Sequence, residues 1–234
     1  MGSKAKYAKY ILPIILKDRR PGQFYVEPFV GSGNLIAKVD GNRIGADINN
    51  YLISFHLAMQ NGWTPPENVS EQEYNDIRLN KDKYPPELVA FVMFSCSYAA
   101  KFGAGYARGK NSKGEYRNYA LEGKNNCLGY KPKLDGVIFK CCSYDELEIP
   151  NNSIIYNDIP YKNTTKYKDK FDHAKFWIWA ENMVNKGHKV FVSEYSAPEN
   201  WNCVWHKEVF NSLTKNTGSK KGIEKLFTLD KKDI

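Results

Sequence analysis

A short apolar segment near the start of the chain runs directly into a glycine-rich turn, and this order leaves few folds open. Residues 23–27 have the composition of a buried strand, residues 28–34 form the turn, and a helix is expected from Leu35. Another helix is expected earlier, from Ser3 to Ile15. Because a strand that feeds a helix through a tight turn begins a βα unit, we expect an α/β fold with parallel strands.

The rest of the chain continues the alternation of strands and helices on both sides of a segment with a different amino-acid composition. Further strands are expected at 43–46, 136–140, 153–157, 189–193 and 224–229, and further helices at 49–60 and 169–185. Between them, residues 61–135 hold proline pairs, an apolar helix over 87–99 and a basic, glycine-rich stretch. We therefore predict a main domain of residues 1–60 and 136–234, with residues 61–135 as an insertion.

Composition excludes several classes of protein. With 42% hydrophobic residues in a chain of 234, there is enough apolar surface for a core. The early apolar run from Ile11 to Leu16 is short and contains Pro13, so we expect neither a signal peptide nor a membrane anchor, and we expect a cytoplasmic protein. Five cysteines without a CxxC pair and four scattered histidines predict reduced thiols and no metal site.

Positive charge is concentrated in one stretch of the chain. Residues 101–140 hold nine basic and three acidic residues, which places six of the eight net positive charges there. Aromatic residues are interleaved with the basic ones, as on surfaces that contact phosphates and stack on bases. This stretch therefore favours a nucleic acid as partner. A second basic cluster is either a further contact to the nucleic-acid backbone or a solvated loop. That cluster contains Lys215, Lys220, Lys221 and Lys225.

Two groups of residues can carry chemistry. Gly31 and Gly33 let a ligand approach the backbone at a strand end, and Asp47, at the end of the next strand, suits a ribose diol. The spacing matches neither GxGxxG nor a P-loop. The second group follows the strand at 153–157, which ends in a carboxylate, a proline turn and an aromatic ring, Asp158-Ile159-Pro160-Tyr161. Together they predict a site at the carboxyl edge of the sheet.

These motifs, in this order, resemble the DNA adenine methylase family over nearly the whole chain. Residues 27–33 resemble its loop for S-adenosylmethionine (SAM), and residues 158–161 resemble its catalytic (D/N)PP(Y/F) tetrad. Gly2-Ser3-Lys4 resembles its N-terminal cofactor segment, and residues 102–119 resemble the target-recognition segments of short, phage-type members. The resemblance implies a Rossmann-like SAM-dependent methyltransferase sheet with an inserted target-recognition subdomain.

The resemblance also assigns residues to roles. It implies catalytic roles for Asp158, Ile159, Pro160 and Tyr161, and cofactor contacts for Lys4, Glu27, Pro28, Phe29, Gly31, Gly33, Asp47, Ser143 and Tyr144. The basic clusters supply the DNA-binding candidates Arg108, Lys110, Lys113, Arg117, Lys220 and Lys221. Two residues depart from the family pattern: Ile159 replaces the first proline of the tetrad, and Ser143 stands where many members have an aspartate.

The expected reaction is transfer of the methyl group of SAM to the N6 amino group of adenine in double-stranded DNA, with base flipping and without a metal. The product of the cofactor is S-adenosylhomocysteine. A monomer without membrane contact is expected, and a cognate restriction nuclease is left open as a partner. Three alternatives also stay open: N4-cytosine methylation, an RNA substrate, and a catalytically inactive DNA-binding protein.

Overall fold

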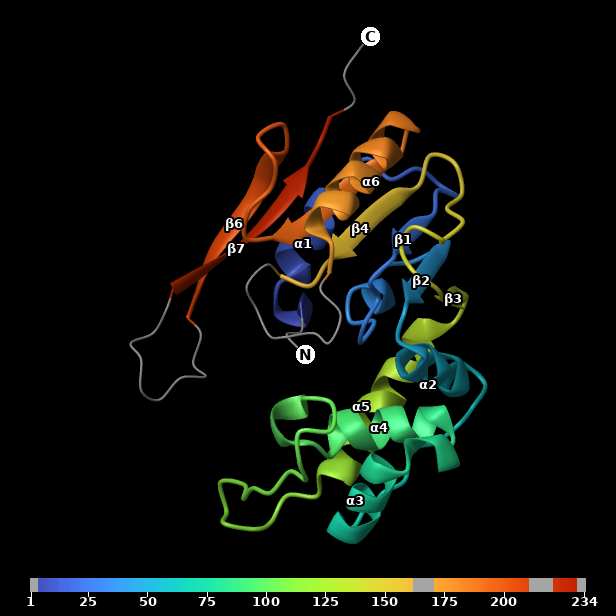
Figure 1. Ribbon diagram of the computed structural model, residues 1–234, viewed down its shortest axis with the longest axis vertical. Coiled ribbons are helices and arrows are strands. Elements are labelled where there is room, and N and C mark those ends of the chain that lie inside the picture. The colour runs from blue at the N-terminus through green and yellow to red at the C-terminus, as the bar shows by residue number, and fades with distance from the viewer. Residues whose placement is uncertain (1–3, 162–170, 211–220, 231–234) are drawn as a thin grey trace.

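The computed structural model describes residues 4–161, 171–210 and 221–230, and its strands form one twisted sheet (Figure 1). The sheet has seven strands in the order β3-β2-β1-β4-β5-β7-β6. Neighbours among the first five strands run parallel, whereas β7 is antiparallel to β5 and β6. The Rossmann-like α/β fold expected from the sequence is confirmed. The strands are β1 (Tyr25–Glu27), β2 (Arg43–Asp47), β3 (Val137–Cys141), β4 (Ile154–Asp158), β5 (Lys189–Glu194), β6 (Asn202–Phe210) and β7 (Lys221–Thr228).

Helices cover both faces of this sheet. Buried residues of α1, such as Ile11 and Ile15, pack in one hydrophobic cluster with Tyr156. Residues of α6, such as Phe176, pack in a second cluster with Ile155 on the opposite face. No helix in the described part of the chain is long and apolar enough to cross a membrane. The helices are η1 (Lys4–Lys6), α1 (Ala8–Ile15), η2 (Ile36–Lys38), α2 (Asn50–Gln60), α3 (Glu71–Leu79), α4 (Pro86–Ser95), α5 (Tyr119–Tyr130) and α6 (His173–Asn185), with shorter 3-10 turns between them.

The segment between α2 and β3 forms a helical group of its own. Figure 1 shows α3, α4 and α5 gathered beyond one end of the sheet, near β2 and β3. They share a separate buried cluster that includes Tyr74, Ile77 and Met93. Because these side chains pack mainly on each other, this segment adds little to the core of the sheet. The boundaries at 61 and 135 remain a prediction.

Several local expectations differ from the structure, and helices α3 and α5 were not expected from the sequence. The helix expected from Leu35 is only the 3-10 turn η2, because Val39 is already extended and Gly41 turns the chain into β2 with a φ of 74°. The helix expected to reach residue 99 ends at Ser95, ahead of Ala99 and Ala100 with positive φ. Strand β6 was missed, because it pairs only with β7 and most of its described side chains are exposed.

Candidate active site

Three carboxylates lie at the carboxyl edge of neighbouring parallel strands. Glu27 ends β1, Asp47 ends β2 and Asp158 ends β4. Strand β1 pairs with β2 on one side and with β4 on the other, so the order of the strands reverses here. Ligands of open α/β sheets bind in the crevice at such a reversal. The fold therefore brings together the two motif groups found in the sequence.

Asp47 holds the glycine-rich turn in place. Its Oδ2 accepts a hydrogen bond from the Gly31 N–H at 3.0 Å, and its Oδ1 accepts one from the Asn49 N–H at 2.9 Å. Gly31 and Gly33 both have positive φ, at 49° and 68°, which favours glycine at these positions. Burial raises the pKa of Asp47, while the two backbone donors oppose this shift. The carboxylate thus orders the backbone of the turn in addition to facing the crevice.

His56 and Tyr130 pack against the same turn from outside the sheet. The ring Nε2 of His56 donates to the Gly31 carbonyl at 2.9 Å, and burial lowers the pKa of His56 to about 4, so the ring is neutral. The Tyr130 hydroxyl donates to the Ser32 carbonyl at 3.2 Å. A Cβ at Gly33 would collide with that hydroxyl. Helix α5 of the insertion therefore contacts the turn directly, through Tyr130, which the sequence had placed only among the aromatic residues of the basic stretch.

Glu27 has a strongly raised pKa. Burial raises the pKa to about 8, while a hydrogen bond of 2.9 Å from the Tyr25 hydroxyl opposes the shift. At neutral pH this carboxyl group is therefore mostly protonated. A cationic ligand group placed beside it would favour the ionised form. Glu27 is thus suited to a ligand that carries positive charge.

Aromatic residues and Ser143 occupy the other side of the crevice. The rings of Phe29 and Tyr144 stack with centroids 5.3 Å apart. Pro28, between Glu27 and Phe29, is buried. The polar groups of Ser143 make local hydrogen bonds: its hydroxyl donates to Asp145, and its N–H donates to Glu146 at 3.1 Å. The cofactor contacts assigned to these residues remain predictions.

The tetrad follows β4 as the sequence predicted. Burial raises the pKa of Asp158 to about 6, with the Lys4 ammonium opposing the shift and the Glu224 carboxylate adding to it. Ile159 is buried in the cluster that contains Phe176. The Pro160 carbonyl accepts a hydrogen bond from the His173 ring at 2.9 Å. The isoleucine therefore fills the core, while the backbone of the turn is held by α6.

Lys4 lies at this tetrad. Its ammonium is 3.6 Å from Asp158 Oδ1, donates to Glu224 Oε2 at 2.6 Å, and is hydrogen-bonded to the Tyr161 hydroxyl. Burial opposes its charge, but the two carboxylates outweigh this effect and raise the pKa of Lys4. Its described contacts are thus with the candidate catalytic residues, whereas the cofactor contact predicted for it is untested. Gly2 and Ser3 lie outside the described residues.

Sequence reasoning did not find Glu224, Glu194, Tyr195 or His173 near the tetrad. The Tyr161 and Tyr195 rings meet edge to face with centroids 4.6 Å apart, and His173 Nε2 lies 3.5 Å from Glu194 Oε2. These residues come from α6, β5, β7 and their connections. They are far from residue 161 in the sequence, or on another element, and only the tertiary structure brings them to the tetrad. For Glu224, the sequence offered only a carboxylate at the start of an expected strand.

The basic candidates of the insertion are partly paired with carboxylates. Arg108 pairs with Glu71, while Arg117 pairs with Glu122 and lies 4.5 Å from the Tyr119 ring. Exposed ion pairs of this kind contribute little to stability, so a phosphate can replace the glutamates at low cost.

Lys110 and Lys113 lie on an exposed hairpin-like turn. Lys110 bridges to Tyr116, and its ammonium is 4.9 Å from the Tyr116 ring centroid. Asn111 orders the turn through hydrogen bonds from the N–H groups of Lys113 and Glu115. The turn therefore presents two lysines and an aromatic ring together.

The second basic cluster is only partly described. Lys215 and Lys220 lie outside the described residues, as does the side chain of Lys221, whereas Lys225 is described.

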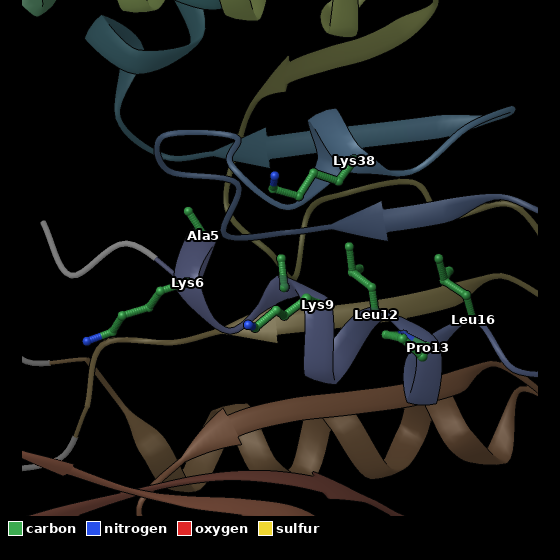
Figure 2. A pocket seen from close by; sticks show the side chains of 8 residues that line it. Ala5, Lys6, Lys9, Leu12, Pro13, Leu16 and Lys38 are labelled. Carbon is green, nitrogen blue, oxygen red and sulfur yellow. The ribbon is translucent and has the colours of Figure 1, made fainter.

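Two hollows lie away from the strand-end carboxylates. One, of about 850 Å³, follows α1 and is lined by Lys6, Lys9 and Lys38 among others, as Figure 2 shows. The other, of about 440 Å³, lies between the glycine-rich turn and helices α2, α4 and α5. Neither is lined by Asp47 or Asp158. The carboxylate site is thus defined by its side chains and not by either of these hollows.

Comparison with known proteins identifies the family. The model of the D12 class N6 adenine-specific DNA methyltransferases matches residues 1–223. The chain belongs to this family. A DNA adenine methylase of Vibrio cholerae is 29% identical over 159 residues, which cover 58% of this chain and 55% of that protein. The chain thus spans about half the length of that curated relative.

Two further matches span more of this chain. A DNA adenine methylase of Salmonella typhimurium is 25% identical over 260 residues of alignment, which cover 94% of this chain and 91% of that protein. A solved structure described as a methyltransferase complexed with SAH is 12% identical, with a TM-score of 0.40, and covers 99% of this chain and 53% of that one.

The carboxylate site of this D12-class chain fits the chemistry of SAM. SAM carries a sulfonium, an ammonium and a ribose diol, which call for buried acidic groups and a close backbone approach. Glu27 and Asp47 offer such carboxyl groups at adjacent strand ends, next to glycines with positive φ. SAM supplies a methyl group bound to a positively charged sulfur. The described residues of the D12-class chain contain no cluster of three or more potential metal ligands.

Proposed function

We propose that this protein transfers a methyl group from SAM to the N6 amino group of adenine in double-stranded DNA. One observation carries the proposal: the glycine-rich turn anchored by Asp47 and the Asp158–Tyr161 tetrad share one edge of the sheet, on either side of β1. Membership of the D12 class supports the choice of adenine as the target base.

The chain's own groups account for activation of the base. An exocyclic amino group is a weak nucleophile, because its lone pair is delocalised into the ring. The Asp158 carboxylate and the Ile159 carbonyl can each accept one N–H bond, which favours a pyramidal nitrogen with a localised lone pair. As the nitrogen–carbon bond forms, the sulfur–carbon bond breaks, S-adenosylhomocysteine leaves, and the amino group loses one proton to Asp158 or to water. Tyr161 stacks on the base and keeps it aligned.

We assign DNA binding to the insertion and to the second basic cluster, which includes Lys220 and Lys221. A base in a duplex cannot reach the tetrad, so the target nucleotide must be extruded, which costs a few kcal/mol. Lys110, Lys113 and Tyr116 form one exposed platform of charge and ring, and Arg108 and Arg117 can exchange their glutamates for phosphates. These contacts would offset the cost of extrusion.

The cellular setting is also part of the proposal. All five cysteines are free in the structure, in agreement with a reducing compartment such as the cytoplasm. We propose that the protein acts there as a monomer on DNA, either alone, as the methylases of phages do, or beside a cognate restriction nuclease.

The test is methyl transfer from labelled SAM to unmethylated double-stranded DNA of mixed sequence, followed by separation of the nucleosides by mass. N6-methyldeoxyadenosine is the expected product. Formation of N4-methyldeoxycytidine would show that the target base is cytosine. Methylation of RNA alone would show that the substrate is RNA. Absence of both SAM binding and methyl transfer would favour a DNA-binding protein without activity.

Methyl transfer should depend on the ionisation of Asp158. The ionised carboxylate is a stronger acceptor of hydrogen bonds than the protonated acid, and only the ionised form can take up the proton of the amino group. The pKa of Asp158 is raised to about 6. At saturating SAM and DNA, we expect kcat to rise as the pH increases through about 6 and to level off above it. A profile that stays flat down to about pH 5 would show that this ionisation does not limit the reaction.

Replacing Ile159 with proline should preserve kcat or raise it. The carbonyl that contacts the base is retained, and proline restricts φ near −65° as in the usual family tetrad. The Ile159 side chain is buried, so the variant should lose about 1–2 kcal/mol of unfolding free energy. Steady-state kinetics and thermal unfolding check these two effects separately. A large fall in kcat in a folded variant would contradict the role of the backbone at this position.

A further inference from the structure

Glu224 is a carboxylate that the proposed chemistry does not use, yet it lies among the residues that carry it. It comes from β7, and its side chain is 13% exposed. Its Oε2 accepts hydrogen bonds from the Lys4 ammonium and from the Tyr161 hydroxyl, both at 2.6 Å. Removing a carboxylate from water costs free energy, and these two partners offset that cost. The pairing links the N-terminal turn, the tetrad and β7.

The Lys4 ammonium stands between two carboxylates. It lies 2.6 Å from Glu224 Oε2 and 3.6 Å from Asp158 Oδ1, so it is hydrogen-bonded to Glu224 and only near Asp158. A lysine side chain is flexible, and a cation beside two carboxylates binds the one it reaches best. Glu224 therefore competes with Asp158 for this cation.

Tyr161 is oriented by the same group. Its hydroxyl is bonded to Glu224 and Lys4, and its ring meets the Tyr195 ring edge to face at 4.6 Å. Burial raises the pKa of Tyr161, so the hydroxyl stays protonated and can donate to Glu224. A ring fixed at both its hydroxyl and its edge presents one face in a constant direction.

We propose that Glu224 is a positioning residue, which retains the Lys4 ammonium and orients Tyr161 so that the oxygens of Asp158 stay available to the amino group of the base. This inference rests on the proposed function, because it assigns the Glu224 carboxylate a part in that reaction. Without the charge of Glu224, the lysine closes onto Asp158 and occupies the acceptor that the base requires. The Tyr161 ring then also loses one of its constraints.

The electrostatic consequence has a definite sign. The Glu224 carboxylate repels negative charge on Asp158, so its removal lowers the pKa of Asp158, and a closer Lys4 lowers it further. The ionisable groups that face Asp158 are Lys4 from η1, Glu27 from β1, Tyr156 from β4, Tyr161 from the turn, Glu194 from β5 and Glu224 from β7.

The test is Glu224→Gln, which keeps the shape of the side chain and removes its charge. We expect kcat to fall about ten- to a hundred-fold, with the KM for SAM nearly unchanged, because misplaced reacting groups slow the chemical step. We also expect the acid limb of the kcat profile to move to lower pH by about one unit. A residue that only stabilises the fold would lower the melting temperature without moving that limb.

Glu199→Gln is the matched control, since it makes the same charge change at an exposed position in the connection before β6. It should leave kcat and the acid limb as in the unchanged protein. If the unchanged protein transfers methyl groups but Glu224→Gln keeps its kcat or its acid limb, the inference alone is overturned. If the unchanged protein transfers none, the proposed function fails, and the inference fails with it.

A double variant guards against a general loss of folding. Because Glu224 acts largely through Lys4, the effect of Glu224→Gln on kcat should be smaller once the charge of Lys4 is removed. In Lys4→Met, the added Glu224→Gln change should therefore lower kcat by far less than it does alone. Equal fold-losses in both backgrounds would show that Glu224 acts independently of Lys4 and would overturn the inference.

Discussion

Asp158→Ala is expected to abolish methyl transfer while leaving the binding of SAM nearly intact. The substitution removes the carboxylate at the end of β4, which in the proposed reaction accepts a hydrogen bond from the target amino group. A preorganised polar group of this kind contributes about a hundred- to a thousand-fold to the rate. The proposed SAM site lies at the other strand ends, where Asp47 orders the glycine-rich turn. Rates from labelled SAM and affinities from calorimetry measure the two effects separately.

Removal of Asp158 also changes its surroundings. The Lys4 ammonium, 3.6 Å from Asp158 Oδ1, keeps Glu224 as its partner, so the alanine variant does not leave a buried cation unpaired. We therefore expect a folded protein.

Asp18→Ala is a suitable control for Asp158→Ala. Asp18 is exposed and pairs with Lys189, at the start of β5 and thus at the opposite edge of the sheet. The control should transfer methyl groups at the unchanged rate. Activity of Asp158→Ala equal to that of this control would remove Asp158 from the reaction.

Asp47→Ala is expected to weaken SAM binding more than it slows transfer at saturating SAM. The variant loses the acceptor for two backbone N–H groups, those of Gly31 and Asn49, as well as the carboxylate predicted to bind the ribose diol. Hydrogen bonds to a charged group contribute about 1.5–3 kcal/mol each, so we expect affinity to fall about ten- to a hundred-fold. Calorimetric titration with SAM measures this loss directly.

Asparagine should not restore the Asp47 site fully. An amide has one acceptor oxygen, and its NH2 group would face one of the two N–H donors, so Asp47→Asn leaves one donor unsatisfied. Asp40→Ala, in the exposed turn before β2, is the control that should bind SAM normally. Unchanged affinity in Asp47→Ala would exclude this carboxylate from the cofactor site.

Much of the fold could be predicted, because the signals involved are local. The strands at Tyr25–Glu27, Arg43–Asp47 and Ile154–Asp158 are short apolar segments that end in turns or in acidic residues. The structure confirms that Asp47 and Asp158 end their strands. The sequence pattern was weaker where packing decided the secondary structure. Edge strand β6 is an example, because its exposed side chains lack a regular alternation of apolar and polar residues.

The sequence by itself determined most of the alternation of strands and helices in the sheet and the two motifs at strand ends, because each depends on residues close together in the chain. Only the tertiary structure placed Lys4 against Asp158 and Glu224, Tyr130 against Gly33, and the insertion arginines against glutamates. Lys4 and Glu224 are separated by 220 residues, so their pairing leaves no local pattern. Such contacts arise when the sheet brings the ends of distant strands to one edge, where burial then sets the pKa values of the groups that meet.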